Sequence, residues 1–121
     1  MKQLLLTTIA AVVLGGCGPS VDIWEAARTG NIEAVKQHLA AGTDVNAKTG
    51  SRWTPLHYTA REGHKEIAEL LVENGADVNA EITAGNYRGK TPLDWAKNQE
   101  TADLLRKHGG KTGEELKTEG K

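Results

Sequence analysis

The 121-residue sequence predicts an all-α solenoid of about three stacked helix–turn–helix units. Residues 42–47 (GTDVNA) recur 33 positions later as residues 75–80 (GADVNA), and residues 54–57 (TPLH) recur 37 positions later as residues 91–94 (TPLD). Apolar side chains between these segments follow the spacing of one helical face. A fixed period of about 20 to 50 residues indicates repeated supersecondary units that stack on one another. Such stacks present extended surfaces rather than closed catalytic clefts.

The composition suits one small folded domain. Charged residues make up 26% of the chain and hydrophobic residues 38%, which is typical of a soluble fold and not of a disordered chain. The net charge of −1 provides no overall basic footprint for nucleic acid or an anionic membrane. Cys17 is the only cysteine, which excludes an intrachain disulfide and a CxxC pair.

The N-terminus has the pattern of a targeting signal. Lys2 is followed by a mostly apolar run at residues 4–14, which is shorter than the ~20 residues that a membrane-spanning helix needs. Residues 14–17 (LGGC) resemble the lipobox of bacterial lipoproteins. The resemblance implies that residues 1–16 are a removed signal peptide and that Cys17 carries lipid. Removal of Lys2 leaves 14 basic and 16 acidic side chains, a mature charge of −2.

Two other interpretations of this segment stay open. It could be an ordinary secretory signal with an incidental cysteine, or Cys17 could be a buried thiol of a cytosolic protein. In the lipoprotein interpretation, residues 17–20 form the acylated cysteine and a short linker. The domain is then tethered to a bacterial envelope membrane and faces the periplasm or the exterior. Gly18 stands after the cysteine in place of an aspartate, which by resemblance favours the outer membrane of a Gram-negative cell.

The first unit is expected at residues 21–50. Asp22 and Glu25 have the spacing of a capping box for a helix that begins near Ile23. Gly30 ends this helix, because glycine tolerates the left-handed conformation. A second amphipathic helix follows and stops at Gly42.

The second unit is expected at residues 51–87. Thr54 can cap a helix whose first turn contains Pro55, where the missing N–H is harmless. Gly63 and His64 make the turn to an outer helix with an apolar stripe, and Gly75 ends that helix.

Taken together, the TPLH segment, the Gly-His turn, the Leu70-Leu71 pair and residues 75–80 resemble the ankyrin repeat family. The resemblance covers roughly residues 21–110. It implies helix–turn–helix pairs joined by outward-pointing β-turn fingers near residues 46–54 and 79–91. It also implies a role in protein binding without a cofactor.

Several departures from the repeat pattern lead to specific expectations. Arg52 stands where the pattern usually has glycine, which puts a tight hairpin in the first finger in doubt. The second finger is four residues longer, since 37 exceeds 33. The third unit, residues 88–110, lacks the Gly-His turn, so its helices should be shortened or nearly fused. Residues 111–121 are expected to be a polar tail in which Thr112 and Glu115 could cap one extra turn.

No arrangement of residues predicts catalysis. The four histidines lie in no HxxxH spacing, and the resemblance gives His57 and His64 a structural role that bridges adjacent turns. Residues 109–112 (GGKT) imitate the end of a phosphate-binding loop, but Leu105 stands where that motif requires glycine. We therefore expect no catalytic residue, no metal site and no cofactor.

Candidate partner-binding residues are those that repeat packing leaves free. The resemblance places Tyr58 and Trp95 on the concave face, with Trp53 at a finger base and Tyr87 in the long finger; Trp24 should pack inward as part of the cap. Tyrosine, tryptophan and arginine predominate at binding hot spots. The alternative is that Tyr58 and Trp95 simply bury against neighbouring helices. The full set is Glu25, Trp53, Tyr58, Arg61, Tyr87, Arg88 and Trp95.

The sequence thus predicts a monomeric, non-catalytic interaction module that is anchored in the envelope and binds an unknown protein partner but no nucleic acid. A structural envelope lipoprotein with no specific partner is the first alternative. A small hydrolase is the weakest, because no site supports it.

Overall fold

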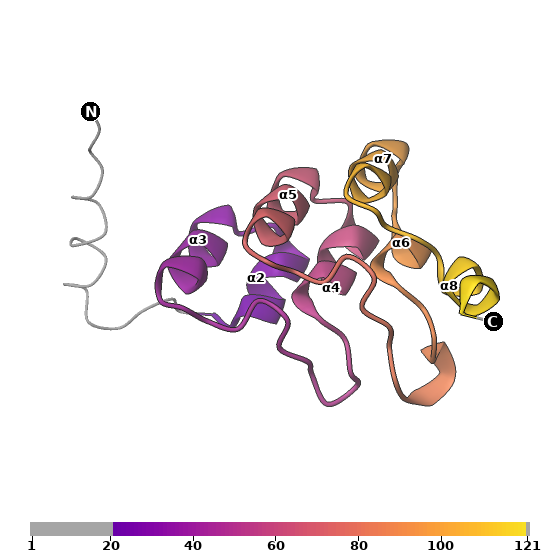
Figure 1. The fold of residues 1–121 in the computed structure, drawn as a ribbon. Coiled ribbons are helices and arrows are strands. Elements are labelled where there is room, and N and C mark those ends of the chain that lie inside the picture. The colour runs from indigo at the N-terminus through magenta and orange to yellow at the C-terminus, as the bar shows by residue number, and fades with distance from the viewer. Residues whose placement is uncertain (1–20, 121) are drawn as a thin grey trace.

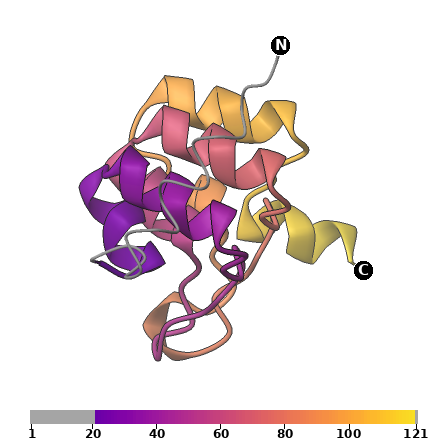
Figure 2. The same ribbon diagram turned by 90° about the vertical axis from the view of Figure 1, so that its left-hand side faces the viewer.

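The computed structural model describes residues 21–120, and within these residues the fold is all-helical and contains no β-strand. The helices α2 to α7 form three successive pairs, and α8 follows them at the C-terminal end. Figure 1 shows the pairs in a row. The inner helices α2, α4 and α6 pack side by side, and the outer helices α3, α5 and α7 form a second row behind them (Figure 2). The helices are α2 (Ile23–Thr29), α3 (Ile32–Ala40), α4 (Pro55–Glu62), α5 (Lys65–Glu73), α6 (Pro92–Trp95), α7 (Gln99–Lys107) and α8 (Gly113–Glu119).

The first helices begin and end where the sequence predicts. The side chain of Asp22 accepts a hydrogen bond of 2.8 Å from the backbone N–H of Glu25, and α2 starts at Ile23. Thr54 caps α4 with Pro55 in the first turn, and Gly63 ends α4 with a φ of 77°. A Cβ atom at Gly63 would lie 2.7 Å from the side-chain nitrogen of Asn98. The positive φ therefore favours glycine at this position, and a larger residue would also displace the Asn98 side chain.

The core lies between the two rows of helices and runs through all three units. Leu56 of α4, Leu71 of α5 and Leu105 of α7 are each at most 1% exposed, and Val35 of α3 extends the core into the first unit. Because each helix pair has too little apolar surface to fold alone, the units stabilise one another by covering these side chains. The continuous core places the inner helices and the loops between units in a fixed relation.

In the third unit the inner helix is shortened, and the two helices are not fused. α6 has four residues, whereas α4 has eight. The chain leaves the helical conformation at Ala96, where φ is −53° and ψ is 120°. Asn98 then caps α7 by accepting a 2.9 Å hydrogen bond from the backbone N–H of Thr101. The third unit is thus shortened in its inner helix, and Asn98 stands in place of the Gly-His turn.

The expected polar tail, residues 111–121, is for the most part a docked helix. Thr112 and Glu115 form the predicted capping box, in which the backbone N–H of Glu115 donates to the Thr112 hydroxyl at 3.1 Å and that of Thr112 donates to the Glu115 carboxylate at 2.9 Å. The helix that they cap, α8, extends for seven residues. The prediction of a capped turn was therefore right, whereas the expectation of a plain tail was wrong because contacts with the third unit hold the segment.

The loops that precede α4 and α6 project as two fingers (Figure 1). In the first finger, residues 46–54, the backbone N–H of Thr49 donates to the carbonyl of Trp53 at 2.9 Å and closes a tight turn. Arg52 adopts a φ of 71°, so the hairpin forms despite the absence of glycine. In the second finger, residues 79–91, the backbone N–H of Ile82 donates to the carbonyl of Lys90 at 3.0 Å. Ile82 is 1% exposed and ties this longer finger to the core.

The left-handed conformation of Arg52 leads to a stability prediction. Replacement Arg52→Gly should raise the free energy of unfolding by about 0.5–1 kcal/mol, because glycine adopts positive φ without a steric cost. Urea unfolding of the two proteins, followed by the helical far-UV signal, measures the change. Gly50→Ala in the same turn is a control in which no strain is relieved. An Arg52→Gly protein that is less stable than the parent would show that the arginine side chain contributes more than the strain costs.

Candidate functional site

Four aromatic side chains from separate elements meet beside the inner helices, and we call them the aromatic cluster: Trp53, Tyr58, Tyr87 and Trp95. Trp53 ends the first finger and lies at the centre, with ring centroids 4.8 Å from Trp95 and 4.9 Å from Tyr58. Its side chain is only 6% exposed. Trp53 was predicted as a contact residue, but its burial makes it the support on which the other rings pack.

Tyr87 brings the second finger onto this cluster. Its ring meets the ring of Trp95 edge-on, with centroids 5.0 Å apart and an interplanar angle of 80°. The same ring stands at 87° to Trp53 at 6.2 Å. Edge-to-face pairs of this kind contribute about 0.5–1.5 kcal/mol beyond their buried area. Tyr87 is nevertheless 48% exposed, and it is the only large hydrophobic residue among residues 21–120 that is exposed.

Arg61 covers the other side of the cluster from α4. Its guanidinium carbon lies 5.1 Å from the centre of the Trp53 ring and 5.3 Å from that of Tyr58. Both distances are within the ~6 Å range of a cation–π interaction. Glu62 accepts a 3.1 Å hydrogen bond from Nε of Arg61 and holds the guanidinium in place. The site therefore combines a fixed cation with aromatic edges.

The remaining predicted residues lie outside the cluster. Glu25 forms a two-point ion pair with Arg28 on α2, with distances of 3.2 and 2.6 Å. Arg88 follows Tyr87 but lines a separate hollow between the second finger and α8. Tyr58 and Trp95 are both half-buried. Each ring thus packs against its neighbours and keeps part of its surface exposed, so a role in partner binding stays a prediction for both residues.

A groove opens between the two fingers beside the aromatic cluster. It has a volume of about 350 Å³ and is lined by Trp53 and Tyr87, by Gly50 and Ser51 of the first finger, and by residues 84–86 of the second. Its walls are aromatic rings and short side chains with little charge. The groove can therefore receive an apolar side chain from another molecule.

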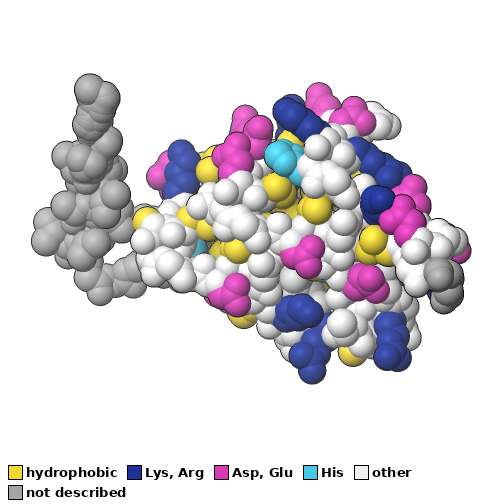
Figure 3. All heavy atoms as spheres, viewed as in Figure 1, with side chains coloured by type: hydrophobic (Ala, Val, Ile, Leu, Met, Phe, Trp, Pro, Cys, Tyr) yellow, Lys and Arg dark blue, Asp and Glu magenta, His cyan; other side chains and the backbone are white. Residues whose placement is uncertain are grey.

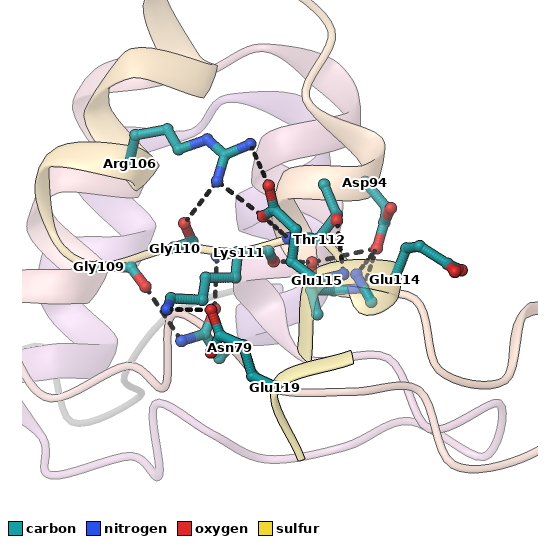
Figure 4. A network of polar contacts seen from close by, with 12 residues as sticks. Asn79, Asp94, Arg106, Gly109, Gly110, Lys111, Thr112, Glu114, Glu115 and Glu119 are labelled. Carbon is teal, nitrogen blue, oxygen red and sulfur yellow. Dashed lines mark hydrogen bonds and ion pairs between the residues drawn. The ribbon is translucent and has the colours of Figure 1, made fainter. Parts of the chain in front are cut away.

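Two asparagines that the sequence analysis missed lock successive units together. The side chain of Asn46 donates to the carbonyl of Gly75 at 3.1 Å and accepts from the backbone N–H of Asp77 at 2.7 Å. Asn79 makes the same two bonds with Gly109 and Lys111, at 3.1 and 2.7 Å (Figure 4). The only signal in the sequence was the recurrence of asparagine in both Asp-Val-Asn-Ala segments. These bonds fix the angle between units and hence the spacing of the fingers.

His57 bridges two units and is fully buried. Nδ1 accepts the backbone N–H of Thr54 at 3.1 Å, so Nε2 carries the proton that it donates to the carbonyl of Lys90 at 3.2 Å. Burial lowers the pKa of His57 to about 4, although hydrogen bonds to backbone groups act in the opposite direction. With both ring nitrogens occupied, His57 has no free position for acid–base catalysis.

The neighbouring units contain equivalents of this bridge. The indole N–H of Trp24 donates to the carbonyl of Ala47 at 2.8 Å, which agrees with its expected place in the cap. In the third unit, Asp94 accepts the backbone N–H of Thr91 at 2.8 Å and that of Gly113 at 2.7 Å (Figure 4). Each unit thus uses the same position to hold the segment that follows it.

Two of the other three histidines, His38 and His64, also bond to backbone carbonyls of separate segments. His64 bonds the carbonyl of Arg28 through Nε2 at 3.1 Å, as its framework position implies. His38, expected near a helix end, bonds the carbonyl of Val21 at 2.8 Å and the hydroxyl of Thr43 at 3.0 Å. Residues 21–120 contain no group of three or more histidine, cysteine or carboxylate side chains placed to hold a metal ion.

The predicted lipid attachment site, Cys17, and the signal at residues 1–16 lie outside the described residues. None of the helices within residues 21–120 combines the length and the apolar character required to cross a membrane.

Comparison with known proteins agrees with the geometry. The sequence profile described as Ankyrin repeats (3 copies) matches residues 23–115. An ankyrin repeat-containing protein of Schizosaccharomyces pombe is 34% identical over 92 residues, which cover 75% of this chain and 42% of the relative. Protein phosphatase 1 regulatory subunit 27 of Mus musculus is 37% identical over 70 residues, which cover 58% of this chain and 43% of the relative.

A bacterial relative from Rickettsia bellii, also named as an ankyrin repeat protein, is 37% identical over 71 residues, with 54% of this chain and 40% of the relative covered. The chain thus spans less than half the length of each of these relatives. The profile covers most of the chain, and the finger, turn and helix-pair geometry recurs from unit to unit. This chain belongs to the ankyrin repeat family.

Proposed function

We propose that this protein is a non-catalytic module that holds a protein partner at a bacterial envelope membrane. Ankyrin repeats are protein–protein interaction modules, and the family is generally non-catalytic. One relative is named as a regulatory subunit of a protein phosphatase, a name that describes association with another protein. The partner of this chain binds to the surface formed by the inner helices and the two fingers.

The aromatic cluster is the observation that supports this surface most strongly. Tyr87 is half-exposed on a loop that is four residues longer than its counterpart, and Arg61 lies over the neighbouring rings. Aromatic residues and arginine at the centre of a surface are typical of binding hot spots. Because Trp53 holds the rings in place from below, the surface is formed before the partner arrives, which reduces the entropy lost on binding.

The proposed anchor depends on the N-terminal sequence. A positive residue, an apolar run and two glycines directly before Cys17 favour lipid attachment at that cysteine. Acylation places the domain next to the membrane as a monomer, with only residues 18–20 between the lipid and the fold. By resemblance, the outer membrane is favoured in a Gram-negative cell.

Replacement Cys17→Ser should move the protein from the membrane fraction to the soluble fraction, because it removes the only side chain that can be acylated in this way. Fractionation of cells that produce each version, followed by immunoblotting, measures the distribution. Ser20→Ala in the linker is a control that should leave the distribution unchanged. Membrane association that persists in the Cys17→Ser protein would contradict the anchor.

Replacement Tyr87→Ala should weaken binding of the partner about thirtyfold, since truncation of a hot-spot aromatic costs ~2 kcal/mol or more. The partner is first identified by crosslinking and stoichiometric pull-down with the full chain, and the affinity of the purified pair is then measured by calorimetry. Tyr87 is a cleaner probe than Tyr58, because Tyr58 is half-buried and its removal also disturbs packing. Lys107→Ala on the outer helix α7 is the matched control.

The alternatives give different results in the same experiments. Bulk association with envelope material, in place of a few stoichiometric partners, would indicate a structural lipoprotein. Normal binding by the Tyr87→Ala protein, or loss of binding only through unfolding, would show that the partner uses another surface.

A further inference from the structure

The two fingers have a net positive charge, whereas the rest of the chain has a net negative charge. Four of the chain's 15 basic residues lie in the fingers, but only one of its 16 acidic residues, Glu81, does so. The fingers therefore carry a net charge of +3 and the remaining residues −4. Figure 3 shows Lys and Arg side chains gathered at the finger edge of the molecule. The four finger cations are Lys48, Arg52, Arg88 and Lys90.

These cations are free to contact another molecule. All four are exposed, and none forms an ion pair within residues 21–120. Four other cations of residues 21–120 are in ion pairs, among them Arg28 with Glu25 and Arg106 with Glu115. The outer helices α3, α5 and α7 together hold six acidic and four basic side chains. The fingers thus have a net positive charge, whereas the outer helices have a net negative one.

The apolar groove lies between the same two fingers. Neither finger arginine lines the groove itself. Arg52 stands in the chain between Ser51 and Trp53, which both line it, and Arg88 directly follows Tyr87 and lines the neighbouring hollow beside α8. Arg61 adds a third positive charge over the cluster, although Glu62 offsets part of it. A ligand that fills the groove and extends past both of its edges therefore has an apolar group at its centre and meets the finger cations on either side.

We propose that the groove between the fingers binds an acidic loop or peptide of a protein, with one apolar side chain inserted against Trp53 and Tyr87 and with carboxylates beside it that contact Arg52 and Arg88. The proposal rests on the proposed function and names the chemistry of its partner. Complementary charge speeds association and selects the partner, while the buried apolar group supplies affinity.

A nucleic acid or an anionic membrane fits this surface less well. Both present rows of phosphates that require an extended track of cations. Here the cations sit at two narrow tips on either side of an apolar groove, and the net charge of the chain is −1. The negative remainder of the molecule repels a long polyanion, whereas a short acidic loop contacts only the fingers.

The test uses a phage library of random 12-residue peptides selected against the purified full chain. We expect selected peptides to be enriched in aspartate and glutamate around an apolar residue. Fluorescence anisotropy of the best peptide then measures its affinity for variants. The double charge reversal Arg52→Glu with Arg88→Glu should weaken binding at least tenfold. The matched reversal Lys65→Glu with Lys107→Glu, on the outer helices, changes the net charge equally and should have little effect.

Three results would overturn the proposal: a library that yields no binder, selected peptides without acidic enrichment, or equal effects of the two double reversals. The peptide is also displaced by competitors: single-stranded DNA, vesicles of phosphatidylglycerol and an acidic protein fragment. If the DNA or the vesicles displace it at a lower concentration than the fragment does, the fingers bind a polyanion and the proposal is wrong. Far-UV spectra and melting curves identify any variant that is unfolded. If binding of the partner is weakened by Tyr87→Ala but not by the reversal of Arg52 and Arg88, the proposed interaction module is supported and only the acidic nature of its ligand is rejected.

Discussion

Acidification from pH 7 to pH 4 should remove about 3 kcal/mol from the free energy of unfolding through His57 alone. Its pKa is lowered to about 4 in the folded protein from an ordinary value of 6.5. Between pH 6.5 and pH 4, His57 is therefore protonated in the unfolded chain but remains neutral in the folded chain. The free energy of unfolding falls as the pH drops through this range. A shift of this size corresponds to about 3 kcal/mol. Single domains are stable by only about 5–15 kcal/mol, so the loss is a large fraction.

The cause of this pH dependence is the buried bridge between two units. A protonated imidazole would carry a hydrogen on Nδ1, which now accepts the backbone N–H of Thr54, and its charge would be buried. Urea unfolding at pH 7 and pH 4.5 measures the slope for the parent and for His57→Asn, which cannot titrate. The variant should be less stable at pH 7 but should lose clearly less stability in acid. Equal slopes would show that other groups control the acid response.

The carboxylate with the most strongly shifted pKa acts in a different pH range. The hydrogen bond with Arg106 lowers the pKa of Glu115 to about 2. The stabilising effect of this pair is present above the ordinary pKa of 4.5 and is lost as the pH falls from about 4.5 to about 2. Measurements between pH 4.5 and 7 therefore separate the effect of His57 from that of the Glu115 pair.

The sequence was most informative where a contact joins residues three or four positions apart. The caps at Asp22, Thr54 and Thr112 were predicted correctly, because each hydrogen bond lies within one turn of its own helix. The period of 33 residues likewise identified the stack, since every unit repeats the same local signals. These features depend on short stretches of chain and can be recognised without knowledge of the fold.

Contacts between units could not be predicted in the same way. The burial of Trp53 depends on Tyr58, Trp95 and Tyr87, which come from three other elements. The placement of Arg61 over that ring depends on the angle between the first finger and α4. A single sequence shows which of these residues are aromatic or basic, but the angle between units decides which of them meet.

The first finger illustrates a different limit. Arg52 takes a conformation that favours glycine, because Thr49 and Trp53 close the hairpin around it. The hydrogen bonds and the burial of Trp53 offset a local strain of about 1–2 kcal/mol. The intrinsic preference of arginine for negative φ disfavours the turn, but the hydrogen bonds and the burial of Trp53 stabilise it by more than the strain costs.

Removal of residues 112–121 should lower the melting temperature by roughly 10 °C or more, because it removes the hydrogen bonds that hold α8 against the third unit. Asp94 loses the 2.7 Å bond from the backbone N–H of Gly113, and Arg106 loses its two bonds to the Glu115 carboxylate, at 2.7 and 3.1 Å. Loss of the part-buried bond between Asp94 and Gly113 should alone cost about 2 kcal/mol, since hydrogen bonds to charged groups are worth ~1.5–3 kcal/mol. Each kcal/mol corresponds to ~4–8 °C in a domain of this size, and the exposed ion pair adds little.

A point variant separates the docking of α8 from its mere presence. A Cβ atom at Gly113 would lie 2.0 Å from the carbonyl oxygen of Gly89 in the second finger, a contact between two backbones that a side-chain movement cannot relieve. Gly113→Ala should therefore lower the melting temperature nearly as much as the truncation, although it keeps every polar side chain of α8. Glu114→Ala alters the next, exposed position and should change stability by less than about 0.5 kcal/mol. If the truncated protein and Gly113→Ala both melt like the parent, α8 does not stabilise the stack. The bond from the backbone N–H of Thr91 to Asp94 would then be sufficient to cap the third unit.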